Sequence, residues 1–179
     1  MTRKLIAYEL LSLDGVAEDP DQFITEWDES MDENLARVIA TQDAVILGRR
    51  TYNDWAAYWP TSEIEPFATF INGVDKYVVT STTPRDLWAN TTVVDNDSLS
   101  RIGALKEESG GDIGLHGSIA LTGALLTAGL VDGLRLVVAP ALQGSGRRLF
   151  DTGVQTGLEL VRTISSPTGY LLVDYEVKR

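Results

Sequence analysis

Short apolar runs alternate with segments of helical periodicity along most of the chain. The first run, residues 4–11, ends at Ser-Leu-Asp-Gly (residues 12–15), where Asp-Gly is typical of a turn. Apolar side chains then recur at helical spacing over residues 31–39, and a second apolar run follows at residues 44–47. This succession predicts two parallel strands joined by a helix.

The alternation continues through the middle of the chain. After Gly48 we expect a helix over about residues 52–58, capped by Thr51 with Asp54 in a capping box and stopped near Trp59-Pro60. Further strands are predicted at residues 76–80, 91–94, 112–115 and 134–139. Of two further helices, one contains Leu99, Ile102 and Leu105 and ends at Gly110-Gly111, and the other covers residues 119–128 with Ser118 as its cap.

The last segment has a period of two. Apolar side chains at odd positions of residues 171–177 alternate with Leu172, Asp174 and Glu176, which predicts a half-exposed strand. With residues 158–164 and the turn at 166–169, it forms an antiparallel hairpin. The predicted fold class is therefore α/β: one domain over residues 1–179, with a mostly parallel sheet, an antiparallel edge and helices on both faces.

Composition narrows the classes of function. The 179 residues carry a net charge of −11, which argues against nucleic-acid binding because that binding depends on many basic contacts to phosphate. The absence of cysteine and the single histidine, His116, exclude thiolate chemistry and leave little for a metal site. No apolar run approaches a membrane span, and residues 1–13 do not form a signal peptide, so we expect a cytoplasmic protein without membrane contact.

The common nucleotide-binding motifs are absent. The chain contains neither GxxxxGK[ST] nor a GxGxxG after its first strand, and one histidine gives little scope for a Ser-His-Asp triad. Residues 144–149 imitate the first half of GxGxxG, and we interpret them as a turn. None of the four tryptophans is assigned to a site.

Three strand-to-helix junctions could bind an anion. The first junction, Gly48-Arg49-Arg50-Thr51, combines the backbone N–H groups of a helix start with two guanidinium groups, and both favour an anion. The alternative is that both arginines only solubilise the helix. Thr80-Ser81-Thr82 offers hydroxyls and no carboxylate, which favours a ribose 2′-phosphate and hence NADP over NAD, unless it is an ordinary turn. Gly117-Ser118 is the third junction, and His116 beside it is interpreted as a packed or hydrogen-bonded rim residue.

These motifs occur together in one known family. In order, Ser12-Leu13-Asp14-Gly15, Leu47 to Tyr52, Tyr58-Trp59-Pro60, Lys76 to Thr82, Gly117-Ser118, Gly129 to Pro140 and Gly144 to Phe150 resemble the dihydrofolate reductase-like family, in particular the reductase domain of bacterial riboflavin biosynthesis. His116 and Gly133 depart from its pattern.

The resemblance implies a fold, a cofactor and a reaction. It implies a dihydrofolate reductase-like three-layer α/β/α fold with a mixed sheet of about eight strands, and NADPH across the strand ends. By this resemblance, the cofactor phosphates would contact Gly48, Arg49, Arg50 and Thr51. The 2′-phosphate would lie by Thr80, Ser81 and Thr82, and the pyrophosphate against Gly117 and Ser118. The nicotinamide would be bordered by Asp14 and Gly15. The implied protein is a homodimeric reductase of a small pyrimidine or pteridine-type substrate, most like 5-amino-6-(5-phosphoribosylamino)uracil reductase.

The proton donor has two candidates, and other functions stay open. Asp32 shares a helical face with Leu35 and Ile39, so partial burial would favour its protonated form. Its place resembles that of the carboxylate in folate reductases. The alternative role for Asp32 is that of a cap at the helix start. Asp14 is the second candidate, with a turn role as its alternative. Dihydrofolate reductase-like activity, or NADPH or pterin binding without turnover, are the rival functions. A flavin-bound electron carrier is disfavoured because no run of hydroxyl residues follows the first strand.

Overall fold

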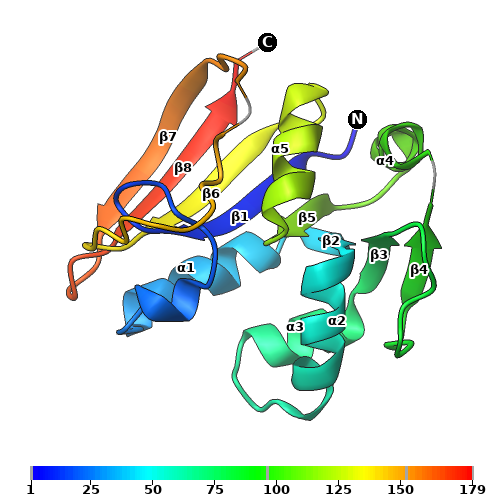
Figure 1. Ribbon diagram of the computed structural model, residues 1–179, viewed down its shortest axis with the longest axis horizontal. Coiled ribbons are helices and arrows are strands. Elements are labelled where there is room, and N and C mark those ends of the chain that lie inside the picture. The colour runs from blue at the N-terminus through cyan, green and yellow to red at the C-terminus, as the bar shows by residue number, and fades with distance from the viewer. Residues whose placement is uncertain (1, 96, 152, 179) are drawn as a thin grey trace.

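One eight-stranded sheet organises the chain, which a computed structural model describes over residues 2–95, 97–151 and 153–178 (Figure 1). The strand order is β4-β3-β2-β5-β1-β6-β8-β7. The strands are β1 (Leu5–Leu11), β2 (Gln42–Gly48), β3 (Asp75–Val79), β4 (Thr91–Val94), β5 (Asp112–His116), β6 (Gly133–Val138), β7 (Leu158–Ser165) and β8 (Leu171–Val177). The strands from β4 to β6 are parallel, whereas β8 pairs antiparallel with β6 and with β7. The predicted mixed sheet and C-terminal hairpin are confirmed.

Helices cover both faces of this sheet. They are α1 (Glu29–Ile39), α2 (Arg49–Tyr58), α3 (Phe67–Gly73), α4 (Ser98–Glu107) and α5 (Ile119–Thr127), with short 3₁₀ turns at Pro20–Gln22 and Trp59–Thr61. One apolar core packs α1, α2 and α3 against the sheet, and a second packs α4 and α5 against the other face. Figure 1 shows α1 and α5 on opposite sides of β1. The three-layer α/β/α prediction is therefore confirmed.

The helix starts differ from the prediction. Helix α2 begins at Arg49 rather than near residue 52, with Gly48 at its N-cap, so Thr51 and Asp54 lie inside the helix and form no capping box. Ser118 does occupy the N-cap position of α5, but its side chain makes no cap hydrogen bond. In both cases the hydroxyl has a partner from elsewhere in the fold, which local pattern could not show.

Helix α3 was not predicted. It has only seven residues, follows an irregular acidic segment, and buries Phe67 and Ile71 in the core. Its C-terminal end is closed by Lys76, whose fully buried Nζ donates to the carbonyls of Ile71 and Val74, each at 2.8 Å, and lies 4.7 Å from the centre of the Trp88 ring. Tertiary contacts stabilise a helix that is too short to form alone.

The alternation of β8 identifies one packed face, on which Val173 is 9% exposed, but misses that the other face is buried as well. Leu171 is 42% exposed, whereas Leu172 and Asp174, predicted to face solvent, are 1% and 3% exposed. This face lies against α1, and the Asp174 carboxylate accepts from Arg37 at 2.8 Å and lies 3.8 Å from Arg135. A buried carboxylate is tolerated here because two guanidinium groups compensate its charge.

No helix in the described part of the chain has both the length and the apolar character needed to cross a membrane.

Candidate functional site

The turns after β2 and β5 are joined by direct hydrogen bonds. Ser118 Oγ accepts from the backbone N–H of Gly48 at 2.8 Å and donates to Thr51 Oγ1 at 2.9 Å. A Cβ at Gly48 would lie 2.9 Å from Ser118 Oγ, so only glycine allows this approach. Gly117 and Ser118 both have positive φ, 63° and 68°, which aims the turn at the start of α2. Two junctions that the sequence predicted separately therefore form one structure.

The two arginines of this junction point to different neighbours. Arg49 Nη1 donates to Thr82 Oγ1, after β3, at 3.4 Å. Arg50 Nη1 lies 3.9 Å from Glu18, in the loop after β1, and Glu18 also accepts from Arg147 at 2.9 Å. The guanidinium groups therefore flank the Gly48 junction on two sides.

The hydroxyls after β3 have different surroundings. Thr80 is buried, and its Oγ1 donates to the Thr82 carbonyl at 2.8 Å and accepts from the Thr82 N–H at 3.1 Å. Ser81 and Thr82 are exposed. Thr80 therefore shapes the turn, while the next two hydroxyls face solvent beside Arg49.

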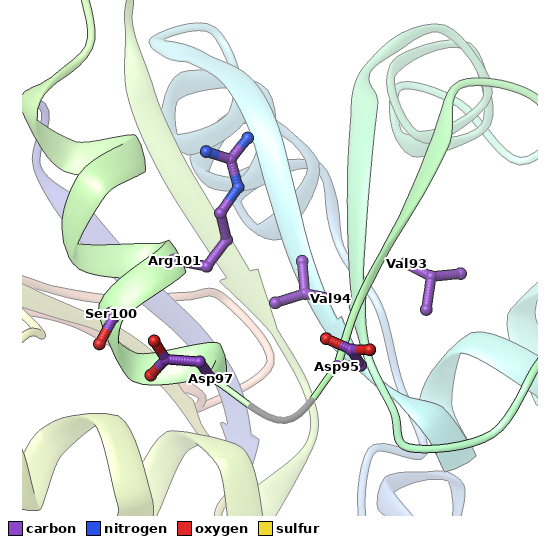
Figure 2. A pocket seen from close by; sticks show the side chains of 6 residues that line it. All are labelled: Val93, Val94, Asp95, Asp97, Ser100 and Arg101. Atoms are coloured by element: carbon purple, nitrogen blue, oxygen red, sulfur yellow. The ribbon is translucent and has the colours of Figure 1, made fainter.

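A cavity of about 420 Å³ adjoins this turn at the end of β4. The Thr80 N–H donates to the Val94 carbonyl at 3.0 Å, which connects the two strand ends. Figure 2 shows Val93, Val94 and Asp95 coming from the end of β4, and Asp97, Ser100 and Arg101 coming from the start of α4. The two carboxylates were not predicted, because they come from the neighbouring strand and helix and not from the turn after β3.

A second cavity of about 900 Å³ lies along α5. Its lining includes Leu99 of α4, Ile119 and Ala120 next to the Ser118 turn, and Arg147 and Arg148 from the loop after β6. Neither Gly48 nor Ser118 lines either cavity, whereas residues of α4 line both.

Asp14 anchors the turn after β1. Its carboxylate accepts from Ser12 Oγ at 2.6 Å and from the backbone N–H groups of Gln143 and Gly144 at 2.9 and 2.8 Å. These hydrogen bonds, from Ser12 first, hold the pKa of Asp14 well below its usual range. Gly15 follows at a φ of 83°. The carboxylate therefore joins the β1 turn to the loop after β6 and stays ionised near neutral pH.

Asp32 lies in the first turn of α1. The cap is made by its neighbour Asp28, which accepts from the Met31 N–H at 3.1 Å, so Asp32 is free of that role. Asp32 is half-buried and accepts from Trp27 Nε1 at 2.7 Å. Sequence reasoning missed Trp27 because nothing in the local pattern connects a loop indole to a carboxylate in the following helix.

Tyr8, on β1, is a buried neighbour of Asp32. Its hydroxyl has no hydrogen-bond partner among the residues that the structure describes. Burial first, and then the negative charge of Asp32, raise the pKa of Tyr8. The phenol therefore stays protonated close to the candidate proton donor.

His116 is part of the core. It is 1% exposed, its Nε2 lies 2.7 Å from Gln42 Oε1, and its ring lies 5.6 Å from that of Tyr8 and 5.4 Å from that of Phe67. Burial lowers the pKa of His116 to about 3, so the imidazole is neutral at physiological pH. The interpretation as a packed or hydrogen-bonded residue is confirmed, but its placement on the rim is wrong, because the ring is buried in the core. Within the described residues, no group of three or more potential ligand side chains could hold a metal ion.

The arrangement fits an extended phosphate-bearing ligand. Because parallel strands end at the same edge of a sheet, the turns after β1, β2, β3 and β5 share one rim. Glycine at position 48 and the left-handed turn at 117–118 let two backbone segments approach closely, and Arg49 and Arg50 supply positive charge on either side. All three junctions named from the sequence lie on this rim.

The chain is similar to known proteins over nearly its whole length. The family model described as the RibD C-terminal domain matches residues 3–172. A protein of Bacillus subtilis called "uncharacterized protein YyaP" is 26% identical over 182 residues, covering 97% of this chain and 94% of its own length.

Two solved structures define the fold. A putative riboflavin biosynthesis protein from Shewanella sp. PV-4 superposes with a TM-score of 0.79 at 16% identity, and the match covers both chains completely. Dihydrofolate reductase from Enterococcus faecalis, complexed with NADP(H), superposes with a TM-score of 0.61 at 18% identity over 99% of this chain and 97% of its own. The fold is therefore dihydrofolate reductase-like.

Proposed function

Because this chain belongs to the RibD C-terminal domain family, we propose that it is an NADPH-dependent reductase of a pyrimidine or pteridine-type substrate. The substrate we favour is that of 5-amino-6-(5-phosphoribosylamino)uracil reductase of riboflavin biosynthesis. The observation that carries the proposal is the contact between Gly48 and Ser118, which brings two candidate anion-binding junctions together beside Arg49 and Arg50.

The cofactor phosphates are assigned to separate parts of the rim. Arg49 and the exposed hydroxyls of Ser81 and Thr82 would bind the 2′-phosphate. The turn at 117–118, the first turn of α2 and Arg50 would bind the pyrophosphate, because N–H groups at a helix start favour an anion. Thr51 and Thr80 hold these turns in shape rather than carrying charge.

The cavity at the end of β4 would receive the adenosine. Its two carboxylates, Asp95 and Asp97, outnumber its one guanidinium group, Arg101, which lies 3.7 Å from Glu108. The cavity would therefore disfavour a phosphate group, so the 2′-phosphate belongs on the side of Arg49. A carboxylate beside the ribose is also what NAD-binding sites use, so a direct comparison of the two cofactors tests this assignment.

The chain supplies proton transfer and orientation. When bound, NADPH supplies the hydride for a C=N or C=O carbon of the substrate. Asp32 would hold the proton for the neighbouring nitrogen or oxygen, and the indole of Trp27 fixes the orientation of its carboxyl group. Asp14 and Gly15 would border the nicotinamide. Because its three donors keep it ionised, Asp14 is assigned to loop anchoring rather than to proton donation.

A substrate screen tests the proposal. Purified protein is mixed with NADPH and either the riboflavin pyrimidine phosphate or dihydrofolate, and NADPH oxidation is followed by absorbance. Faster oxidation with the pyrimidine phosphate supports the proposal, and faster oxidation with dihydrofolate supports the dihydrofolate reductase-like alternative. Saturable NADPH binding without oxidation would leave the binding-protein alternative, and no binding would contradict all three.

We extend the proposal to assembly as a cytoplasmic homodimer. Strand β7 is the outer strand of the sheet and exposes Leu160 and Val161, at 53% and 57%, and Leu171 of β8 is 42% exposed beside it. Exposed apolar side chains on a sheet edge are a common place for contact with a second copy. A monomeric mass by light scattering at micromolar concentration would contradict this assembly.

A further inference from the structure

Glu9 is a charged side chain buried in the middle of the sheet, and the proposed reaction does not use it. It lies on β1, beside Leu136 of β6, and is 4% exposed. Its neighbours along the strand on the same face, Ala7 and Leu11, belong to the apolar core beneath α5. A carboxyl group in this position needs a polar partner.

Its partner is Thr122 of α5, which is fully buried. Thr122 Oγ1 donates to Glu9 Oε1 at 2.8 Å and lies 3.3 Å from the Gly117 carbonyl oxygen. A hydroxyl has one proton, so it donates well to only one of these acceptors at a time. When Glu9 is ionised, its carboxylate takes this proton; when Glu9 is protonated, it can donate to Thr122 Oγ1, and Thr122 then donates to Gly117.

The Gly117 carbonyl begins the turn that reaches the rim, where the cofactor phosphates are assigned. The next residue, Ser118, bonds Gly48 and Thr51 across the rim. The protonation state of Glu9 is therefore connected, through one hydroxyl, to the turn assigned to the pyrophosphate.

No charged group on the described elements around Glu9 compensates the charge of its carboxylate. Helix α5 has no ionisable residue between Ile119 and Thr127. On β5, His116 turns its ring to the opposite face, against Tyr8. On β6, Arg135 also lies on that face, where it donates to Glu176 at 3.0 Å.

The loop after β6 contributes Arg147 and Arg148, which are engaged elsewhere. Arg147 donates to Glu18 at 2.9 Å, and Arg148 donates to the Asp14 carbonyl at 3.0 Å and lies 3.9 Å from its carboxylate. Burial, only partly offset by the hydrogen bond from Thr122, raises the pKa of Glu9 to about 8.

We propose that Glu9 is a positioning residue for the β5–α5 turn, acting through Thr122, and that NADPH binds with uptake of a proton by Glu9. The inference rests on the proposed function, because it needs the cofactor phosphates at this turn. An ionised Glu9 would repel phosphates held above it, so binding favours the protonated carboxyl, with the proton supplied by the buffer. Reciprocally, NADPH affinity falls as pH rises.

Calorimetric titration with NADPH tests the inference. Wild type and Glu9→Gln are titrated in two buffers of different protonation enthalpy, between pH 7.5 and 9. This pH range lies above the titration of the cofactor's own phosphate. We expect wild type to take up a fraction of a proton and to bind roughly fivefold more weakly at pH 9 than at pH 7.5. Glu9→Gln, which keeps the shape and a donor, should lose both effects; Glu159→Gln, on exposed β7, is the matched control.

A second variant tests the connection through the hydroxyl. Thr122→Val keeps the side-chain shape but cannot donate a hydrogen bond to the Gly117 carbonyl. NADPH should therefore bind to this variant at least threefold more weakly at pH 7.5, a pH at which Glu9→Gln binds NADPH normally. Equal affinity in Thr122→Val and wild type overturns the positioning role.

The two proposals fail in different ways. Wild type that binds NADPH without proton uptake, or Glu9→Gln that keeps the pH dependence, overturns this inference and leaves the proposed function standing. Wild type that shows no saturable NADPH binding overturns both. The wild-type measurement needs no variant, so a folding defect in Glu9→Gln cannot hide the result.

Discussion

The hydroxyl of Ser118 accepts a hydrogen bond from the backbone of Gly48 at 2.8 Å, across 70 residues of sequence. This contact closes the rim between the ends of β2 and β5, and it depends on a glycine at one side and a left-handed serine at the other.

Removing the Ser118 hydroxyl should weaken both the rim and cofactor binding. Ser118→Ala leaves the Gly48 N–H without its partner, which costs about 1 kcal/mol of stability, and keeps the unfavourable positive φ. Ser118→Gly loses the same hydrogen bond but adopts this φ without strain. We therefore expect a lower melting temperature for the alanine variant than for the glycine variant, and weaker NADPH binding in both. Equal melting temperatures would contradict the strain at position 118.

The two arginines should have separable effects. Arg49→Ala should weaken NADPH binding at least tenfold, about 1.4 kcal/mol, with a much smaller effect on NADH, because Arg49 is assigned to the 2′-phosphate. Arg50→Ala should weaken both cofactors by similar factors, because the pyrophosphate is common to them. Fluorescence titration with each cofactor measures the two dissociation constants for each variant.

Lys4→Ala is the control for lost positive charge, since Lys4 is exposed at the amino end of the sheet. Neither arginine variant should change the melting temperature. Unchanged NADPH binding in both arginine variants would leave these side chains with a solubilising role only.

Asp32→Asn should reduce turnover by at least tenfold and leave the NADPH dissociation constant within twofold of wild type, because an amide cannot donate a carboxyl proton. Glu33→Gln, at the exposed next position of α1, is the matched control. Trp27→Phe should give an intermediate loss, since it removes the hydrogen bond that orients Asp32. Full activity of Asp32→Asn would assign proton donation to another group.

His116 should remain neutral well into the acid range. The chain has one histidine, so its imidazole proton signal in NMR is unambiguous, and we expect no titration shift between pH 8 and 5. With a folded-state pKa of about 3, the unfolded chain binds the proton first as pH falls below about 6.5, so this residue lowers stability progressively from there toward pH 3. A normal titration near pH 6.5 would show that His116 is accessible to water.

The order of elements could be predicted because it depends on local pattern. Apolar runs between turn residues identified the strands, and period-two alternation identified β8. The same pattern missed the second buried face of β8, because Asp174 is buried by contacts with Arg37 of α1 and Arg135 of β6. It failed for α3 because seven residues carry too little periodicity.

The chemistry of the rim was predicted only in part. Residue types at strand ends indicated Gly48, Arg49, Thr82 and Ser118 because parallel strands place their carboxyl ends together. That Arg49 and Arg50 diverge, that Asp95 and Asp97 line the neighbouring cavity, and that Trp27 reaches Asp32 all depend on contacts between distant segments.

The sequence by itself determined the fold class, the family and the rim on which the candidate residues lie, because hydrophobic periodicity and turn residues act over a few neighbouring positions. The tertiary structure alone decided which hydroxyls bond to which backbone groups and which carboxyls lose contact with water. Glu9 shows the difference: as a residue in an apolar strand it carries no signal, and only its burial against Thr122 raises its pKa and connects it to the turn at Ser118.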